Sequence, residues 1–409
     1  IDELAPTLRK AFLIASSGRK GPVLVDIPRD VLKADGEYIK EEPVIYEPKA
    51  FSDEKKLLRA ADMLSRAKKP LIYFGGGINS PDAAKYFSEF IKKTEIPCVH
   101  TIMATGIMDF EDELNLGMLG MHGSGAANSA INEADVIFAC GTRFSDRVVV
   151  RPESFAKKAK IIHLDIDPSE INKNVKAHLS LEGDAASVLK ALLPLVSKKD
   201  LSLWKKQIQK FKDEDYVPDK TTERLTPYNI MSLINEKAGE DAIYTTDVGK
   251  HQMWAAQYIK KVCPKSFLTS GGLGAMGYGY GAAIGAKCAF PERQVIHITS
   301  DGSFMMNLNE AATAVKYSLG VISVILNNSS LGMVRQWQDV LCDGRHHGSS
   351  VNSKTDFMLL AEGFGAVGLR CKTYEEFENA FSEALKKKTP VWIECLIDKD
   401  EKVLPMIYE

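Results

Sequence analysis

The strongest constraint on the fold is an alternation along the chain of apolar runs of strand length with segments of helix length. The runs include "PLIYF", "DVIFAC" and "KIIHLD" in the first half, and "VIHITS", "VISVILNN" and "PVWIECLID" in the second. Such runs are typical of strands buried on both faces and joined by crossover helices. The pattern predicts an α/β chain with two doubly wound parallel sheets.

The length and the spacing of these runs predict the domain organisation. A chain of 409 residues is too long for one core, and about 150 residues per domain gives two or three domains. We place one α/β domain at 56–197 and another at 225–409, joined by a charged linker with some helix at 198–224 that we expect to be solvated; another linker, at 31–55, precedes the first of these domains. Residues 1–30 contain one helix and one strand ("GPVLVDIP"), too little for a core, so they either pack on the rest of the chain or, as we favour, form the end of a further domain.

Local signals predict where several helices begin. Ser80 followed by Pro81, and Thr226 followed by Pro227, pair a helix-capping side chain with a proline at the first helical position. Thr373 is followed three residues later by a glutamate, which predicts a capping box at the start of "YEEFENAFSEALKKK".

The composition argues against several classes of function. The net charge is -2 and no long basic stripe occurs, which argues against nucleic acid or an anionic membrane as the main partner. No apolar run approaches the roughly 18 residues of a membrane-spanning helix. The seven cysteines include no C-x-x-C pair and several lie in apolar runs, which favours buried thiols in a reducing, cytoplasmic compartment over a zinc site.

A carboxylate and a carboxamide follow two consecutive strands of the second domain. Asp301 comes after "QVIHITS" and Asn328 closes "VISVILNN", with one helix between them. In a β-α-β unit both strands are parallel, so both side chains are expected at the carboxyl edge of the sheet, where open α/β sheets bind ligands. Their oxygen atoms suit Mg²⁺, and the carbonyl of Ser330 offers a third ligand.

Gly302 and Ser303 then begin a helix whose N–H groups favour an anion such as a phosphate. A carboxylate about 4 Å from a phosphate charge is repelled by roughly 4 kcal/mol at an effective dielectric constant of 20, so an aspartate there implies a cation between them. Asp-Gly and Asn-Asn are also ordinary turn pairs, and the residues alone leave both interpretations open.

The first domain carries weaker signals of the same kind. Three glycines at 75–77 follow a strand and could cradle a phosphate, although a plain glycine turn has the same sequence. Asp165 ends "IIHLD" and is placed like an acidic residue that contacts a ribose.

Asp-Gly-Ser followed by Asn-Asn at this spacing resembles the thiamin diphosphate motif, in which the aspartate and the second asparagine hold Mg²⁺ on the diphosphate. Six further stretches widen the similarity: "TTDVGKHQMWAAQYI", "SGGLGAMGYGYGAAIGA", "LGMVRQWQ", "GMLGMHGSGAAN", "GTRFSDRV" and "IIHLDIDPSEINKN". Together they resemble the catalytic large subunits of the acetolactate synthase (acetohydroxyacid synthase) family over nearly the whole chain.

The resemblance implies thiamin diphosphate, Mg²⁺ and FAD as cofactors. It also implies decarboxylation of pyruvate and transfer of the two-carbon unit to pyruvate or 2-oxobutyrate, the first step of branched-chain amino acid synthesis. A homodimer or homotetramer and a possible small regulatory subunit follow as expected partners. The alternatives are a related flavin-free thiamin-diphosphate decarboxylase or carboligase, and a non-catalytic paralogue on the same fold.

By this resemblance the domain at 56–197 is the FAD-binding domain, that at 225–409 is the thiamin-diphosphate-binding domain, and 1–30 ends a pyrimidine-binding domain. The family's catalytic glutamate lies in the earlier part of that third domain and has no counterpart here, so we expect this 409-residue chain to be inactive alone. Met276 is expected to hold the cofactor bent, Arg147 to lie near the acceptor's carboxylate, and Trp337 to shape the second-substrate pocket.

The resemblance also implies the cofactor contacts. Mg²⁺ is expected on Asp301, Asn328 and Ser330, and thiamin diphosphate on Val248, Gly249, Lys250, His251, Gly274, Met276, Gly302, Ser303, Leu331, Gly332 and Met333. FAD is expected on Arg19, Gly76, Thr101, Ile102, Leu119, Gly120, Met121, His122, Gly141, Thr142, Arg143, Phe144, Ser145, Asp165, Ile166, Gly183 and Asp184. Lys250 stands where the family usually has glutamine, which adds a positive charge near the diphosphate.

Overall fold

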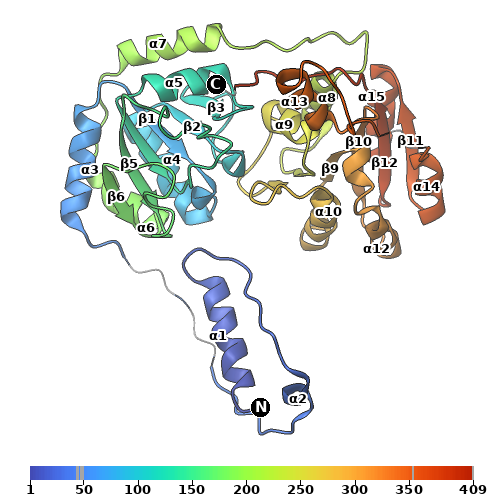
Figure 1. Cartoon of the computed structure of the whole chain (residues 1–409), viewed down its shortest axis with the longest axis horizontal. Coiled ribbons are helices and arrows are strands. Elements are labelled where there is room, and N and C mark those ends of the chain that lie inside the picture. The colour runs from blue at the N-terminus through green and yellow to red at the C-terminus, as the bar shows by residue number, and fades with distance from the viewer. Residues whose placement is uncertain (43–45, 47–49, 352–353, 408–409) are drawn as a thin grey trace.

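The chain forms two α/β domains side by side, with an N-terminal segment that projects from them (Figure 1). The structure is a computed structural model and describes residues 1–42, 46, 50–351 and 354–407. Each domain is built on a six-stranded sheet in which all neighbouring strands are parallel. The predicted fold class is therefore confirmed. None of the helices in the described part of the chain is long and apolar enough to cross a membrane.

The sheet of the first domain has the strand order β3-β2-β1-β4-β5-β6. Its strands are β1 (Pro70–Phe74), β2 (Cys98–His100), β3 (Asn115–Met118), β4 (Val136–Cys140), β5 (Lys160–Asp165) and β6 (Leu179–Glu182). Its helices are α3 (Glu54–Arg66), α4 (Pro81–Thr94), α5 (Gly125–Glu133) and α6 (Ala185–Leu192), with short 3-10 turns η1 (Gly76–Ile78), η2 (Ile102–Ala104) and η3 (Leu193–Leu195). Every residue of β1 and β4 is buried, as their unbroken apolar sequences predict.

The sheet of the second domain has the order β11-β12-β10-β9-β7-β8. Its strands are β7 (Ile243–Thr246), β8 (Phe267–Thr269), β9 (Val295–Ser300), β10 (Val321–Asn327), β11 (Val367–Cys371) and β12 (Val391–Leu396). Its helices are α8 (Pro227–Lys237), α9 (Lys250–Tyr258), α10 (Tyr278–Ala289), α11 (Asp301–Phe304), α12 (Ala311–Lys316), α13 (Gly332–Leu341), α14 (Phe357–Phe364) and α15 (Tyr374–Ala384), with the turn η4 (Leu308–Glu310).

The predicted helix starts are confirmed by their capping bonds. The hydroxyl of Ser80 accepts a hydrogen bond from the N–H of Ala83 at 3.3 Å, and α4 begins at the following proline. Both Thr226 and Thr373 cap their helices in full capping boxes. Such caps satisfy N–H groups that have no partner within the helix, and they fix where the helix begins.

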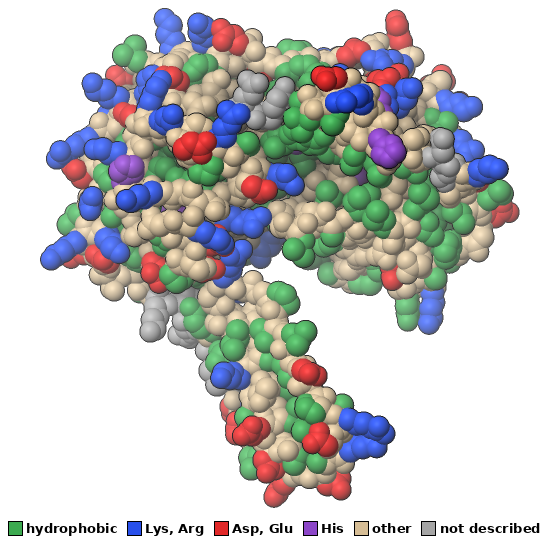
Figure 2. Space-filling model, viewed as in Figure 1, with side chains coloured by type: hydrophobic (Ala, Val, Ile, Leu, Met, Phe, Trp, Pro, Cys, Tyr) green, Lys and Arg blue, Asp and Glu red, His purple; other side chains and the backbone are tan. Residues whose placement is uncertain are grey.

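The N-terminal segment differs from its prediction in one element. Helix α1 (Leu4–Ser16) forms as expected, but the strand predicted from "GPVLVDIP" is wrong: these residues are irregular, and the short helix α2 (Arg29–Lys33) follows. A strand needs a neighbour for its backbone hydrogen bonds, and no described strand lies beside this one. Hydrophobic side chains are therefore exposed on this segment, with Leu24 at 89% (Figure 2).

The linker between the two domains contains a packed helix, α7 (Ser202–Asp213). The helix was predicted, but we expected it to be solvated. Instead Trp204 and Ile208 are buried in the core of the first domain, and the indole N–H of Trp204 donates to the carbonyl of Pro70 at 2.9 Å. Beyond the helix, the carboxylate of Asp215 accepts the N–H of Gly125 at 2.8 Å at the start of α5.

Candidate functional site

The register of the second sheet brings the two predicted metal ligands to one edge. Strands β9 and β10 are parallel neighbours, and Leu326 pairs with Ser300, the last residue of β9. Asp301 and Asn328 therefore both follow the carboxyl ends of adjacent strands. The chain runs outward from β7 to β8 on one side and from β9 to β10 on the other, so the loops after β7 and β9 meet where the strand order reverses. Open α/β sheets bind ligands at such a point.

Asp301 has the properties of a carboxylate that could bind a cation. The side chain is buried, and neither carboxylate oxygen has a hydrogen-bond partner among the described residues. Burial raises the pKa of this carboxyl to about 6, although the nearby backbone N–H groups of Gly302 and Asn328 favour its charged form. An unpaired buried carboxylate is costly, and a divalent cation would satisfy it.

The loop that carries Asn328 and Ser330 is held by backbone bonds. The amide oxygen of Asn328 accepts the N–H of Ser330 at 3.2 Å and retains a second lone pair for another ligand. The loop is tied to residues 349–351 by two backbone hydrogen bonds, from the N–H of Leu331 to Ser349 at 2.8 Å and from Val351 to Ser329 at 2.9 Å, and the hydroxyl of Ser330 also donates to the carbonyl of Ser349 at 2.9 Å. The loop therefore holds Asn328 and Ser330 in place beside the end of β9.

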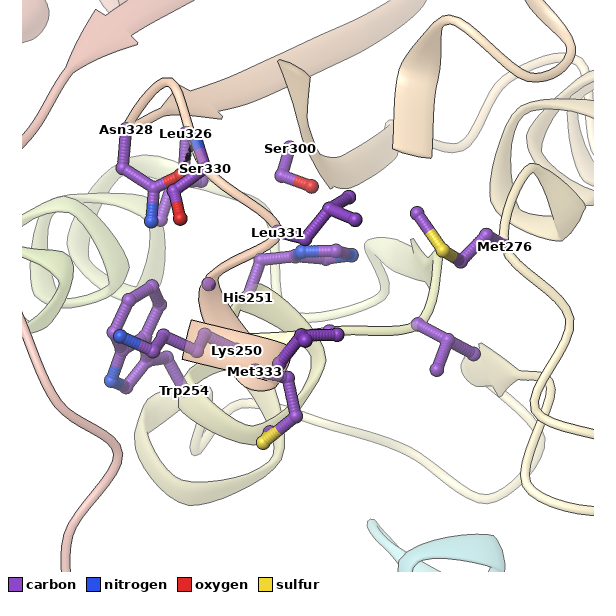
Figure 3. Close-up of a pocket in the computed structure, with 14 residues that line it drawn as sticks. Lys250, His251, Trp254, Met276, Ser300, Leu326, Asn328, Ser330, Leu331 and Met333 are labelled. Carbon is purple, nitrogen blue, oxygen red and sulfur yellow. Dashed lines mark hydrogen bonds between the residues drawn. The ribbon is translucent and has the colours of Figure 1, made fainter. Parts of the chain in front are cut away.

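These loops surround a cavity (Figure 3). Figure 3 shows Asn328 and Ser330 at one end of the cavity and Met276 at the other. The lining residues are Val248, Gly249, Lys250, His251, Trp254, Met276, Ser300, Leu326, Asn328, Ser330, Leu331, Gly332, Met333 and Val334. Most of the contacts expected for thiamin diphosphate thus lie around one space, with the polar Asn328 and Ser330 at one end and the apolar Met276 at the other.

The loop after β7 brings a helix N-terminus and a lysine to the cavity. Gly249 has a φ of 154°, and a Cβ at this position would lie 2.8 Å from the ring of His251. Burial lowers the pKa of His251 to about 4, so its ring is neutral at pH 7. Burial also lowers the pKa of Lys250 to about 8, and its ammonium donates to the carbonyl of Glu401 at 2.6 Å. Backbone N–H groups and a buried cation together suit a diphosphate.

The residues expected to bind FAD follow the strands of the first sheet in a row along its carboxyl edge. In chain order, the residues found at the end of each strand are Gly76 at β1; Thr101 and Ile102 at β2; Leu119, Gly120, Met121 and His122 at β3; Gly141, Thr142, Arg143, Phe144 and Ser145 at β4; Asp165 and Ile166 at β5; and Gly183 and Asp184 at β6. A ligand lying across this edge could contact all six strand ends.

Two features of this edge fit a polar ligand. The turns after β1 and β4 touch through their backbones: the N–H of Gly77 donates to Gly141 at 3.0 Å, and a Cβ on Gly141 would lie 2.6 Å from the Cα of Gly77. In addition, the hydroxyl of Thr101 and Nδ1 of His122 are buried without a hydrogen-bond partner in the described structure. Buried polar atoms are normally paired, so a ligand with hydrogen-bonding groups would complete the edge.

Three of the charged residues expected at the flavin are already bonded. The guanidinium of Arg19 lies 2.8 Å from Glu170 and also contacts Asp167. The carboxylate of Asp184 caps α6 by accepting the N–H of Ser187 at 2.9 Å. Asp165 accepts a backbone N–H from Asp167, and burial raises the pKa of the Asp165 carboxyl.

The carboxyl edge of the first sheet faces the second domain. The side-chain amide of Gln257, on α9, donates to the carbonyl of His122 at 2.9 Å and to that of Leu404 at 3.2 Å. The N–H of Lys265 donates to the side chain of Asn79 at 3.1 Å. Direct hydrogen bonds thus join the two domains.

Comparison with known proteins agrees with this geometry. Residues 57–192 match the thiamine pyrophosphate enzyme central domain, and residues 247–395 match the C-terminal TPP binding domain of the same enzymes. The acetolactate synthase large subunit of Haemophilus influenzae is 37% identical over 99% of this chain and 73% of its own length. The large subunits of isozymes 3 and 2 of Escherichia coli K12 are each 38% identical, over 99% and 100% of this chain and 73% and 74% of their own lengths.

The chain belongs to the acetolactate synthase large-subunit family.

Not every residue expected from the acetolactate synthase resemblance lies at the cavity. Trp337, on α13, and Gly274 are outside its lining. Arg147 is exposed on the first domain, where its backbone carbonyl accepts the N–H of Met121 at 3.0 Å. Gly302 adjoins the cavity through Leu331, whose Cδ2 lies 3.1 Å from where a Cβ on Gly302 would be, and Ser303 is buried beside it.

The structure also adds residues that sequence reasoning missed. Trp254, Leu326 and Val334 line the cavity. Trp254 lies one helical turn beyond Lys250, so a helix begun at Lys250 would have placed it on the same face. The other residues carried no such signal, because the sequence does not show which strand end or helix face borders a cavity.

Proposed function

We propose that this chain is the catalytic subunit of an acetolactate synthase. It would decarboxylate pyruvate on thiamin diphosphate and transfer the two-carbon unit to a second 2-keto acid, giving 2-acetolactate from pyruvate or 2-aceto-2-hydroxybutyrate from 2-oxobutyrate. The observation that carries the proposal is the unpaired, buried Asp301 beside Asn328, in a chain whose relatives carry this name over nearly its whole length.

In the proposed site the chain holds and orients the cofactor. Asp301, the amide of Asn328 and the carbonyl of Ser330 would bind Mg²⁺, which in turn would hold the diphosphate. The N–H groups at the start of α9 and the ammonium of Lys250 would balance the remaining negative charge. Bound thiamin diphosphate supplies an electron sink for loss of CO₂ from a 2-keto acid.

The apolar residues of the cavity have a different task. Met276, Leu331 and Met333 line the part of the cavity away from Asn328, where the cofactor's rings would lie. A flexible methionine side chain can fill the irregular space beside a bent ligand, and apolar walls exclude water from the reacting atoms. FAD would lie along the carboxyl edge of the first sheet and serve as a structural group, because the reaction involves no net oxidation.

Trp337, Arg147 and the assembly state belong to the same proposal. Trp337 would shape the pocket of the second substrate and Arg147 would lie near its carboxylate once the subunits assemble as a homodimer or homotetramer. The relatives' designation as large subunits supports a small regulatory partner.

Calorimetry with thiamin diphosphate and Mg²⁺ tests the proposal. We expect the parent chain to release or take up heat on binding, with an absolute need for the metal, and the Asp301→Ala variant to show none. The Asp135→Ala variant is the control, because Asp135 is a carboxylate at the opposite edge of the first sheet that accepts two backbone N–H bonds. Absence of binding by the parent chain would refute the proposal.

The finer proposals have their own readouts. In an assembly that also supplies the pyrimidine-binding domain, acetolactate formed from pyruvate, and 2-aceto-2-hydroxybutyrate formed when 2-oxobutyrate is added, would establish the substrates. A yellow protein with flavin absorbance would support FAD, and its absence after reconstitution would favour the flavin-free alternative.

A further inference from the structure

Asp247 is a fully buried carboxylate that no part of the proposed chemistry uses. It follows Thr246, the last residue of β7, and directly precedes Val248, the first residue of the cavity lining. A carboxylate buried in the protein interior is costly unless it is hydrogen-bonded, so its partners indicate what it does for the fold.

The two oxygens of Asp247 bond to two other segments. Oδ1 accepts the backbone N–H of Gly279, in the first turn of α10, at 2.5 Å. Oδ2 accepts the hydroxyl of Thr299, on β9, at 2.5 Å and lies 3.2 Å from Nε2 of His297 on the same strand. Asp247 thereby caps a twelve-residue helix and joins β9 at the same time.

Each of these segments leads into the candidate cofactor site. The loop after Asp247 carries Val248 and Lys250, which line the cavity. The chain before Gly279 carries Met276, at the apolar end. The strand that contains Thr299 ends at Ser300 and leads directly into Asp301. Asp247 therefore begins one of the three segments that would hold the two ends of thiamin diphosphate, and its carboxylate is bonded to the other two.

The packing around this carboxylate leaves little freedom for the three segments to shift. A Cβ on Gly279 would lie 2.6 Å from Nε2 of His297 and 2.8 Å from the backbone nitrogen of Asp247. The ring of His297 stacks on Tyr280 of α10, with centroids 5.5 Å apart, and its Nδ1 lies 3.3 Å from the hydroxyl of Ser323 on β10. The network extends from β10 to α10 and has Asp247 at its centre.

We propose that Asp247 is a positioning residue, which fixes the distances between the loop after β7, the segment that carries Met276 and the end of β9 that leads into Asp301. The inference rests on the proposed function, because it assumes that these distances match the length of thiamin diphosphate. Asp247 touches neither cofactor nor substrate in this role. Loss of its bonds would let the three segments move independently and would weaken cofactor binding without unfolding the domain.

Hydrogen exchange in the ligand-free chain tests the positioning role by itself. In Asp247→Ala we expect faster exchange in peptides that cover 247–251 and 276–280, with unchanged protection in β11 and β12 of the same domain. Asp135→Ala is the matched control: it also removes a carboxylate that accepts backbone N–H bonds, at 2.6 and 2.9 Å, but in the other domain. A loss of protection spread evenly over the second domain would overturn the proposal, since it would show a purely global effect.

Cofactor affinity supplies the second readout. Trp254 lines the cavity, so quenching of its fluorescence reports binding of thiamin diphosphate with Mg²⁺. We expect about 10- to 100-fold weaker binding in Asp247→Ala, the cost typical of losing a residue that orients the ligands of a metal. A folded Asp247→Ala chain that binds within about twofold of the parent contradicts the positioning role.

A milder variant keeps the test decisive if Asp247→Ala fails to fold. Thr299→Val removes only one of the accepted bonds, and we expect about fivefold weaker binding together with faster exchange confined to the same peptides. Parent-like exchange and affinity in Thr299→Val would then overturn the inference. A parent chain that binds no thiamin diphosphate would refute the proposed function, while the exchange experiment would still decide whether Asp247 holds the three segments together.

Discussion

The buried ammonium of Lys250 gives a prediction about stability with a defined sign. Lys250 is 4% exposed, and burial lowers the pKa of its ammonium from 10.5 to about 8. The difference of about 2.5 in pKa corresponds to about 3 kcal/mol of unfolding free energy at 1.36 kcal/mol per pKa unit. Between pH 8 and 10.5 the unfolded chain binds the extra proton, so stability rises with pH there, and at pH 7 the full cost is present.

Replacing Lys250 with glutamine should therefore stabilise the cofactor-free chain at pH 7. The variant removes the buried charge but also the bond from the ammonium to the carbonyl of Glu401, which contributes about 1.5 kcal/mol as a hydrogen bond to a charged group. We expect a net gain of about 1 to 2 kcal/mol in the free energy of unfolding, measured by urea denaturation with tryptophan fluorescence. The gain should shrink between pH 8 and 10.

Bound cofactor should make the parent chain more stable than the Lys250→Gln variant. A diphosphate charge about 4 Å from the ammonium attracts it by roughly 4 kcal/mol at an effective dielectric constant of 20, and the glutamine variant lacks this attraction. Saturating thiamin diphosphate and Mg²⁺ should therefore stabilise the parent more than Lys250→Gln. Lys212→Gln is the matched control, because the ammonium of Lys212 also donates to a backbone carbonyl, that of Glu113, in the other domain. A Lys250→Gln chain that is less stable than the parent without cofactor, and equally stabilised by it, would refute the reasoning.

Two further predictions concern glycines at close backbone contacts. Gly279→Ala should destabilise the second domain by about 2 kcal/mol or more in urea denaturation, because its Cβ would collide with His297, whereas Gly285→Ala on the same helix meets nothing within 4 Å and should stabilise by about 0.5–1 kcal/mol. Gly141→Ala should yield a folded chain that retains less flavin after reconstitution with FAD, read from flavin absorbance, because its Cβ would push apart the turns after β1 and β4; flavin retention equal to the parent's would contradict this.

The long buried strands and the metal-ligand pair could be predicted because their signals are local. β1, β4 and β10 are unbroken apolar runs, and the position of Asp301 and Asn328 follows from the geometry of one β-α-β unit. The strands that were missed have weak patterns. β6 is four residues long, β3 contains a glycine with φ +89°, and β11 is an edge strand whose residues are mostly half-exposed.

The burial of Lys250, the bonds of Asp247 and the irregular conformation of the N-terminal run could not be predicted from the sequence, for physical reasons. The burial of Lys250 depends on Glu401, 151 residues away, and the sequence gives no sign of that contact. Asp247 looks like an ordinary turn residue in "TTDVG" until β9 and α10 close around it. The run "GPVLVDIP" has strand composition, but composition cannot supply the neighbouring strand that a sheet requires.

Helix α7 bears on how the two domains can be studied apart. Trp204 is part of the first domain's core and the carboxylate of Asp215 accepts an N–H at the start of α5. The segment up to Asp215 therefore stabilises the first domain and is not a flexible linker. A cut near residue 198 would remove Trp204 from the core of the first domain and expose the residues that pack around its indole to water. For separate expression of the two domains, the chain should be divided within residues 216–224, so that α7 and Asp215 stay with the first domain.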